Sequence, residues 1–210
     1  MGKRSEEKQE TRQRIIAAAS RLVRQEGIAG LKVADVMAAA GLTHGAFYAH
    51  FADKSELIEA AFYEAFDHRE NWIGSARKRP PEERLSHLLN TYLTPKHRDT
   101  PEQGCAFAAL AREFAQAGGE FPKAFEGELG ISIEHLIELL SEENGDDAKQ
   151  TAMGVLSLCV GGMVLARAVD NPKLSNEVLK AARAFGQQDH FKEDKKHDIS
   201  KLRKHCSNSH

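Results

Sequence analysis

Side chains that can bind a nucleic acid gather in a short segment, residues 43–54. Four of them can donate or accept hydrogen bonds: Thr43, His44, Tyr48 and His50. Gly45 has no side chain and lets the backbone approach a partner closely. Threonine and histidine at the beginning of a helix suit contacts with base edges and phosphates in a DNA major groove. Lys54, at the start of the following helix, adds a positive charge where a phosphate can bind.

Two short helices separated by a glycine are predicted to position these side chains. The first helix carries an apolar set that ends before Gly41, and the second is predicted to begin at a Thr43 cap. Small residues before the glycine let the two helices approach, which is typical of a helix-turn-helix. Leu42, Phe47 and Phe51 are expected to pack the second helix onto the first, so that the polar residues point outward.

Helical periodicity of apolar residues continues along nearly the whole chain, and no segment shows sustained alternation. We therefore expect an all-α fold of about nine helices. One apolar stripe ends at Gly27, a residue that can adopt the left-handed conformation of a helix stop. We expect further helices to be capped by Asp53, Thr100 and Ser175.

Charge is distributed unevenly although the formal net charge is only −2. Residues 1–54 carry nine Lys and Arg against six Asp and Glu, whereas residues 55–210 carry 20 against 25. A weakly basic head on an acidic body suggests that the two parts meet different partners. The composition, 41% hydrophobic and 29% charged, excludes a disordered or collagen-like chain.

The three cysteines, Cys105, Cys159 and Cys206, form no disulfide framework, which favours a reducing cytosol and a cytoplasmic protein. The N-terminus shows no signal peptide. The longest apolar run, residues 152–166, is shorter than the roughly 20 residues of a membrane span, so no membrane partner is expected.

The stretch from Thr11 to Ile58 resembles the DNA-binding domain of the tetracycline-repressor (TetR) family of bacterial regulators. The likeness rests on Thr-Arg-x-x-Ile-x-x-Ala-Ala at 11–19, Ala-Gly-Leu-Thr-x-Gly-Ala-Phe-Tyr-x-His-Phe at 40–51 and Lys-Ser-Glu-Leu-Ile at 54–58. The resemblance implies a homodimer with a three-helix head on each subunit and a helical ligand-binding body. It also implies a repressor that binds a palindromic operator in double-stranded DNA and is released by a small-molecule ligand, here unknown.

The resemblance also assigns individual DNA contacts. By motif position, Thr43, His44 and Gly45 would face bases, and Tyr48, His50 and Lys54 would hold phosphates. The family usually has threonine or serine just before the second helix, where this chain has Leu31 and Lys32. Neither residue can act as an N-terminal cap, but Lys32 can reach a phosphate, so it joins the expected DNA contacts.

Aromatic residues are concentrated in the first half of the body and are candidates for an apolar ligand pocket between helices. The candidate pocket residues are Phe66, Tyr92, Phe107, Phe114, Phe125 and Met163. Ordinary core packing is the alternative for each aromatic residue.

The helix expected at 152–169 is apolar nearly all round and contains three glycines, so it must be buried on more than one side. We interpret it as a dimer interface, built with the last helix from each subunit as a four-helix bundle. The candidate interface residues are Gly154, Leu158, Gly161, Gly162, Leu165, Leu179 and Ala182. The alternative is the central helix of a monomeric core.

These interpretations divide the chain into three parts: a DNA-binding domain at 1–53, a ligand-binding and dimerisation domain at 54–186, and a disordered tail at 187–210. Two other functions stay open, a DNA-binding dimer without small-molecule control and a helical enzyme. Against an enzyme, the chain contains no HExxH, GxSxG, P-loop or dinucleotide motif. We therefore expect no catalytic residues, no metal site and no cofactor.

Overall fold

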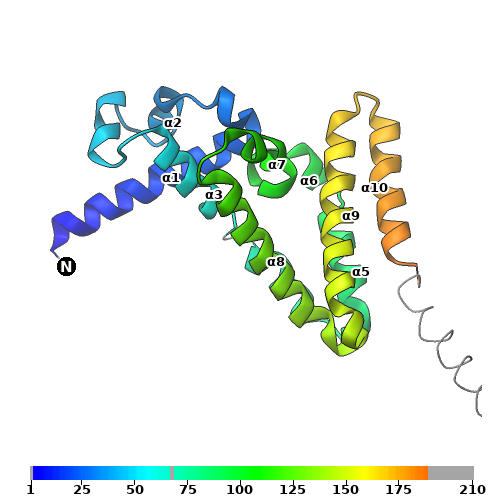
Figure 1. Ribbon diagram of the computed structural model, residues 1–210. Helices are drawn as coiled ribbons and strands as arrows, with labels where there is room; N and C mark the ends of the chain where they lie inside the picture. Colours follow the sequence, from blue (N-terminus) through cyan, green and yellow to red (C-terminus); the bar gives the residue numbers. More distant parts are fainter. Residues whose placement is uncertain (1, 67–68, 189–210) are drawn as a thin grey trace, which may run out of the picture.

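The computed structural model describes residues 2–66 and 69–188, and every regular element in these residues is helical (Figure 1). The all-α fold predicted from the sequence is confirmed, with ten α-helices in the described residues instead of about nine. The elements are α1 (Lys3–Gly30), α2 (Val33–Ala39), η1 (His44–Ala49), α3 (Lys54–Glu64), α4 (Arg69–Arg77), α5 (Pro81–Tyr92), α6 (Pro95–Asp99), η2 (Pro101–Gln103), α7 (Ala106–Ala117), α8 (Phe121–Asn144), η3 (Gly145–Asp147), α9 (Ala148–Ala168) and α10 (Pro172–Gly186).

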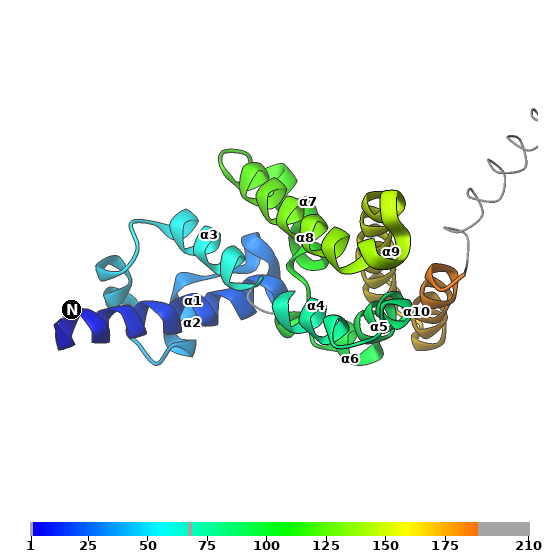
Figure 2. The same cartoon turned by 90° about the horizontal axis from the view of Figure 1, so that it is seen from below.

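The N-terminal elements α1, α2, η1 and α3 pack together at one end of the molecule (Figures 1 and 2). Their shared core is apolar, and Ile15, Val36, Met37, Phe47 and Leu57 are each at most 1% exposed. This core fixes η1 against α2 and leaves the opposite side of η1 to solvent.

Gly27 adopts a positive φ of 76°, as its sequence position predicted, but it kinks α1 instead of ending it. The helix resumes and closes at Gly30, where the amide of Leu31 donates to the carbonyl of Gly27. A side chain at Gly27 would meet the carboxylate of Glu113, because α7 passes close to this bend.

The remaining helices form the body, in which α8 packs on α9 and α9 on α10. In both views α9 and α10 lie side by side at the end of the molecule opposite the N-terminus (Figures 1 and 2). Helix α3 contacts both α1 and α8, so it joins the N-terminal elements to the body. The predicted boundary after residue 53, which assigns α3 to the body, stays a prediction.

One of the four expected helix caps forms as predicted. The Asp53 carboxylate accepts a hydrogen bond of 2.9 Å from the amide of Glu56, and the Glu56 carboxylate accepts one of 2.7 Å from the amide of Ala52. Reciprocal bonds of this kind satisfy amides that have no partner inside the helix. This capping fixes the start of α3.

The caps expected at Thr43, Thr100 and Ser175 do not form. Thr100 donates to the carbonyl of Lys96, and the next α-helix begins only at Ala106, after one 3-10 turn. Asn171 caps α10 instead, by accepting from the amides of residues 173 and 174. Pro172 suits the first helical position because its missing amide is not needed there, so α10 is capped four residues earlier than expected.

Helix α9 is long and apolar enough to cross a membrane by length and composition alone. Nine of its residues are buried in the described part of the chain, where it packs against α8 and α10. This packing accounts for one side of the helix. The predicted tail lies outside the described residues, apart from residues 187 and 188.

Candidate nucleic-acid interface and ligand cavity

Adjacent aromatic residues on η1 point in opposite directions. Phe47 is 1% exposed and stacks on Phe51 with ring centroids 5.6 Å apart, whereas Tyr48 is 71% exposed. Thr43, His44 and Gly45 are exposed on the same short element. Because Phe47 anchors η1, the element presents four candidate DNA contacts from a rigid base.

The other three predicted contacts lie near this element and differ in how exposed they are and in whether they already bond within the chain. Lys32 is exposed at the start of α2. Lys54 is half-buried, and its Nζ donates a 3.0 Å hydrogen bond to the carbonyl of Ile28, so part of its capacity is used inside the chain. The pKa of His50 is lowered by burial and by the nearby cations Lys8 and Arg12, which favours a neutral ring near pH 7.

Two cations of α1 belong to this surface, although the sequence motif did not point to them. The guanidinium of Arg12 lies 4.6 Å from the centroid of the Phe51 ring and 3.1 Å from the Glu56 carboxylate. Lys8 is exposed and influences His50 electrostatically. Only the packing of α1 along α3 brings these residues near the recognition segment.

A cavity of about 200 Å³ lies in the body between α4, α5, α7 and the loop before α7. Three of the six predicted pocket residues line it: Phe66, Tyr92 and Phe107. Three further apolar residues line it, Trp72 and Ile73 of α4 and Leu156 of α9.

The other three predicted pocket residues do not line this cavity. Phe114 is fully buried against Phe62, with ring centroids 4.1 Å apart, and Phe125 packs within the same aromatic cluster. Met163 lies in a separate apolar cluster with Cys159. For these residues core packing, the alternative weighed above, describes their position.

One residue of the cavity wall, Arg69, belongs to an ion pair that the sequence did not indicate. Arg69 donates to the Glu128 carboxylate at 2.6 Å and to the Ser132 hydroxyl at 3.0 Å. Its guanidinium lies 5.1 Å from the centre of the Phe66 ring. Arg69 and Glu128 are far apart in sequence, so no local spacing could have paired them.

His97 holds a defined tautomer at the cavity wall. The backbone amide of Cys105 donates to its Nε2 at 3.0 Å, so Nε2 carries no proton, and Nδ1 donates to the carbonyl of Tyr92 at 2.8 Å. Burial lowers the pKa of His97, partly offset by the bond to Tyr92, and Arg167 lowers it further. The wall therefore contains a neutral histidine that joins α6 to the start of α7.

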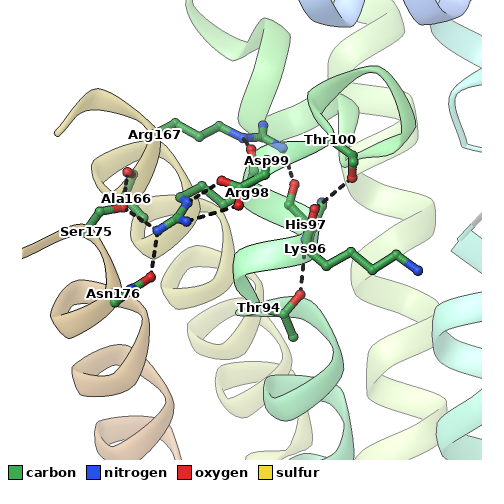
Figure 3. A network of polar contacts seen from close by, with 10 residues as sticks. All are labelled: Thr94, Lys96, His97, Arg98, Asp99, Thr100, Ala166, Arg167, Ser175 and Asn176. Carbon is green, nitrogen blue, oxygen red and sulfur yellow. Dashed lines mark hydrogen bonds and ion pairs between the residues drawn. The ribbon is translucent and has the colours of Figure 1, made fainter. Parts of the chain in front are cut away.

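A polar network holds α6 against the far end of the body (Figure 3). Arg167 of α9 donates to the carbonyls of His97 and Arg98 at 2.9 and 3.2 Å. Arg98 in turn donates to the Ser175 hydroxyl and the Asn176 side chain of α10, both at 2.8 Å. The histidine at the cavity wall is thereby linked to the α9–α10 pair.

The DNA-facing end is linked to the cavity through α1. Arg24 is buried near the end of this helix and donates a 2.9 Å hydrogen bond to the carbonyl of Gly104, which lines the cavity. Burial lowers the pKa of Arg24. Glu113 of α7 accepts from the amide of Ile28, just after the bend in α1. Movement of the cavity wall would thus reach α1 directly.

The predicted dimer residues of α9 and α10 fall on two different sides. Gly161 and Leu165 are exposed on α9, whereas Gly162 and Leu179 are buried inside the subunit. A side chain at Gly162 would meet the Cβ of Ala182, so this glycine permits the close approach of α9 to α10 within one chain. Gly154, Leu158 and Ala182 are partly buried.

The structure adds apolar residues to the outer side. Exposed large side chains on this pair of helices include Met153, Val164, Leu165 and Leu174. Met153 and Val164 lie about three helical turns apart on one side of α9, and the exposed Gly161 and Leu165 lie next to each other at i and i+4. With Leu174 of α10 they form the exposed stripe of this helix pair. In residues 2–66 and 69–188 no group of three or more His, Cys, Asp or Glu side chains is arranged to hold a metal ion.

Comparisons with known proteins agree with this geometry. Residues 15–61 match the family model of bacterial regulatory proteins of the tetR family. The HTH-type transcriptional regulator TtgR of Pseudomonas putida is 46% identical over 66 residues, 30% of this chain. That stretch spans only 31% of TtgR, so the sequence likeness covers about a third of each chain.

Likeness in structure extends over most of the chain. A tetR-family regulator from Cytophaga hutchinsonii superimposes with a TM-score of 0.72 at 20% identity, over 85% of this chain and 94% of that one. AibR, solved in complex with isovaleryl coenzyme A and operator DNA, gives a TM-score of 0.60 at 18% identity, covering 83% and 97% of the two chains. At this identity the match establishes the fold alone.

Proposed function

Since the chain is a member of the tetR family of bacterial regulatory proteins, we propose that it is a cytoplasmic, homodimeric repressor released from a palindromic operator by a small molecule. The main support for DNA binding is that the neighbouring residues Phe47 and Tyr48 differ in burial: Phe47 is buried and Tyr48 is exposed. One ring anchors η1 in an apolar core, and the other stands in solvent beside Thr43 and His44. Such an arrangement suits insertion of the element into a major groove.

The proposed contacts divide into those that read bases and those that hold phosphates. Thr43, His44 and Gly45 are assigned to bases, and the remaining four, Lys32, Tyr48, His50 and Lys54, to the DNA backbone. Because His50 has a lowered pKa, its contact is a neutral hydrogen bond rather than an ion pair. The predicted charge contribution therefore comes mainly from lysines.

Selection from random DNA duplexes, followed by affinity measurements at several salt concentrations, tests this assignment. Lys32→Ala should weaken binding to all sequences alike and lower the salt slope by about one. His44→Ala should change the preferred base at its position, with a penalty of about 1–3 kcal/mol for the selected sequence.

Lys78→Ala, which removes an exposed lysine of the body, provides the matched control and should leave both properties unchanged. If Lys32→Ala and Lys78→Ala behave alike, the assigned backbone contact is wrong. If the selection enriches no sequence, sequence-specific DNA binding is refuted.

We propose that the apolar stripe on the outer side of α9 and α10 forms the dimer interface. It contains Gly161, Leu165 and Leu174, whereas Gly162 and Leu179 support it from inside the subunit. Leu165→Glu should convert the dimer to a monomer in sedimentation, because it places a charge in a desolvated contact. Ile131→Glu, at another exposed apolar residue on α8, should remain dimeric. A Leu165→Glu variant that stays dimeric would contradict the assignment.

Control by a small molecule is supported by the cavity, and it distinguishes this proposal from a DNA-binding dimer without such control. At about 200 Å³ the cavity is smaller than the ~300–1,000 Å³ usual for drug-sized ligands, so it suits a compact compound. AibR was solved with both a ligand and operator DNA, which is consistent with such control in this fold. The hydrogen bond from Arg24 to Gly104 offers a path from the cavity to the helix that begins the head.

A further inference from the structure

The two cysteines in the described residues occupy opposite environments. Cys105 is half-buried, lines the cavity and immediately precedes α7. Cys159 is fully buried in an apolar cluster, and burial raises the pKa of its thiol far above the usual value. Of these two thiols, Cys105 is the one accessible to a compound that enters the cavity.

Positive charge surrounds the Cys105 thiol. It lies at the N-terminus of the 12-residue helix α7, where the helix dipole is positive. Arg24 and Arg167 are both close enough for Cys105 to raise their pKa electrostatically, against the lowering by burial. Partial exposure in an electropositive setting is the environment in which a cysteine acts as a nucleophile.

A hydrogen-bond donor without a strong acceptor lies beside this thiol. Tyr92 is 5% exposed and lines the same cavity, and its hydroxyl has no nitrogen or oxygen partner in the described residues. The group next to it is the Cys105 sulfur, which is a weak acceptor. Its ring is held between Trp72 and His97, with centroid separations of 5.1 and 4.5 Å. The pKa of Tyr92 is raised first by burial and then by Cys105, which places the phenol and the thiol next to each other. A buried hydroxyl without a strong acceptor is costly, so it favours a ligand that supplies an acceptor.

We propose that the cavity takes a small, neutral α,β-unsaturated carbonyl compound, which reacts covalently with Cys105 while the Tyr92 hydroxyl binds its carbonyl oxygen. The Cys105 sulfur forms a bond to the β-carbon, and the carbon–carbon π bond breaks. The electrons shift onto the carbonyl oxygen, where the tyrosine hydroxyl stabilises the negative charge. The thiol proton ends on the α-carbon, so S–H adds across the double bond and no other reactant is consumed.

The adduct would act on the contact that joins the cavity to the head. Cys105 follows Gly104, whose carbonyl accepts from Arg24 of α1. Gly104 is also tightly enclosed, because a side chain there would meet Arg167 and His97 at under 3.0 Å. Added volume on the neighbouring residue would therefore push on the side chains of Arg167 and His97, which surround Gly104. This inference rests on the proposed function, since it names the ligand class of the same cavity.

The experiment uses cyclohex-2-enone as the probe and cyclohexanone, which lacks the double bond, as the matched compound. The dimeric protein is treated at pH 7, and intact mass with peptide mapping gives the site and rate of addition. We expect the fast adduct to form at Cys105, at least about tenfold faster than the adduct of glutathione under the same conditions. Cyclohexanone should leave no adduct.

Variants show whether the cavity residues speed the reaction of Cys105 or whether it reacts like any exposed thiol. Cys159→Ala should react at the wild-type rate, and Cys105→Ser should lose the fast addition. Tyr92→Phe should slow addition by about tenfold or more, because it removes the donor to the developing oxyanion. Thermal unfolding of each variant shows whether the fold persists, and Tyr92→Phe is expected to retain it because it removes only an oxygen. Equal rates for wild type and Tyr92→Phe, or addition at Cys105 no faster than to glutathione, would overturn the proposal.

A second measurement links the chemistry to regulation. The affinity of each protein for a duplex from the random selection is measured before and after treatment, so each variant serves as its own reference. We expect wild type and Cys159→Ala to lose at least about tenfold in affinity and Cys105→Ser to lose none. If untreated protein binds the selected duplex but the adduct binds equally well, the covalent switch is refuted and DNA binding by the head stands. If untreated protein enriches no duplex, the proposed function itself fails.

Discussion

The DNA-binding head and the wall of the cavity bury different kinds of side chain. Every buried residue in the segment 31–62 is hydrophobic, and the polar side chains of that segment point outward or lie at its edges. Around the cavity and its supports the buried set includes Arg24, Glu128, Ser132 and Ser175. An apolar core tolerates substitutions that keep its volume, whereas a buried charge requires a specific partner in a specific place.

This difference indicates how each region serves its proposed role. The head needs only a rigid base for side chains that bind outside it, and close packing provides that. The body has to recognise a ligand and transmit its presence, and both tasks use polar groups whose partners lie on other helices. Arg69 with Glu128 and His97 with Cys105 are examples.

The largest effect is expected from the core of the head. Phe47→Ala should lower the free energy of unfolding by about 3–5 kcal/mol, because it removes a fully buried ring. Tyr48→Phe, one residue along, should change it by less than about 0.5 kcal/mol while weakening DNA binding. Urea denaturation measures the first quantity and a binding titration the second. Similar losses of stability in the two variants would contradict the conclusion that Phe47 stabilises the head and Tyr48 does not.

The buried ion pair of the body comes next. Glu128→Gln should cost about 3 kcal/mol, because the Arg69 guanidinium, whose side chain is only 14% exposed, loses its counter-charge. The exposed pair of Arg77 and Glu138 supplies the control, since Glu138→Gln should cost less than about 1 kcal/mol. Equal costs, measured by urea denaturation, would contradict the contrast between a buried and a solvated pair.

A smaller effect is expected at the helix starts of the head. Asp53→Ala should lower stability by about 1 kcal/mol, because the amide of Glu56 loses its cap. Thr43→Ala should leave stability nearly unchanged, since the Thr43 side chain accepts no capping hydrogen bond. Thermal unfolding of the two variants distinguishes them, and a larger loss for Thr43→Ala would show that threonine caps η1 after all.

The smallest effect concerns pH and compares one histidine from each region. Burial lowers the pKa of His97 below its ordinary value of 6.5, so the folded protein binds its proton less readily than the unfolded chain. The free energy of unfolding is therefore highest above pH 6.5, where His97 is neutral in both states. It falls as the pH drops from 6.5 to the lowered pKa of the folded state, because the unfolded chain takes up the proton first. Below that pKa both states are protonated, and this contribution no longer changes with pH.

His97→Gln should therefore flatten the pH dependence of the unfolding free energy just below pH 6.5. His50 has a lowered pKa of the same sign but lies at the surface of the head, so His50→Gln should flatten it less. Urea denaturation between pH 5 and 8 gives both slopes. If His50→Gln flattens the pH dependence more than His97→Gln does, burial of His97 is not the main cause of that dependence.

Local patterns predicted the head well. The outward set of η1, the packing role of Phe47 and the cap at Asp53 all depend on residues within a few positions of one another. The cap expected at Ser175 does not form because Asn171, four residues earlier, caps the helix and Pro172 takes its first position. Half of the predicted pocket residues line the cavity, since aromatic composition alone cannot separate a wall from a filled core.

The amino-acid sequence alone determined the all-helical class, the helix-turn-helix and the residues that face outward from it, because periodicity and turn geometry act over a few residues. Only the tertiary structure decided which side of α9 is exposed, that Arg69 meets Glu128, and that Cys105, Tyr92 and His97 share one cavity. Those contacts join residues far apart in the chain, and their partners are chosen by the packing of whole helices. No spacing in the sequence encodes that choice.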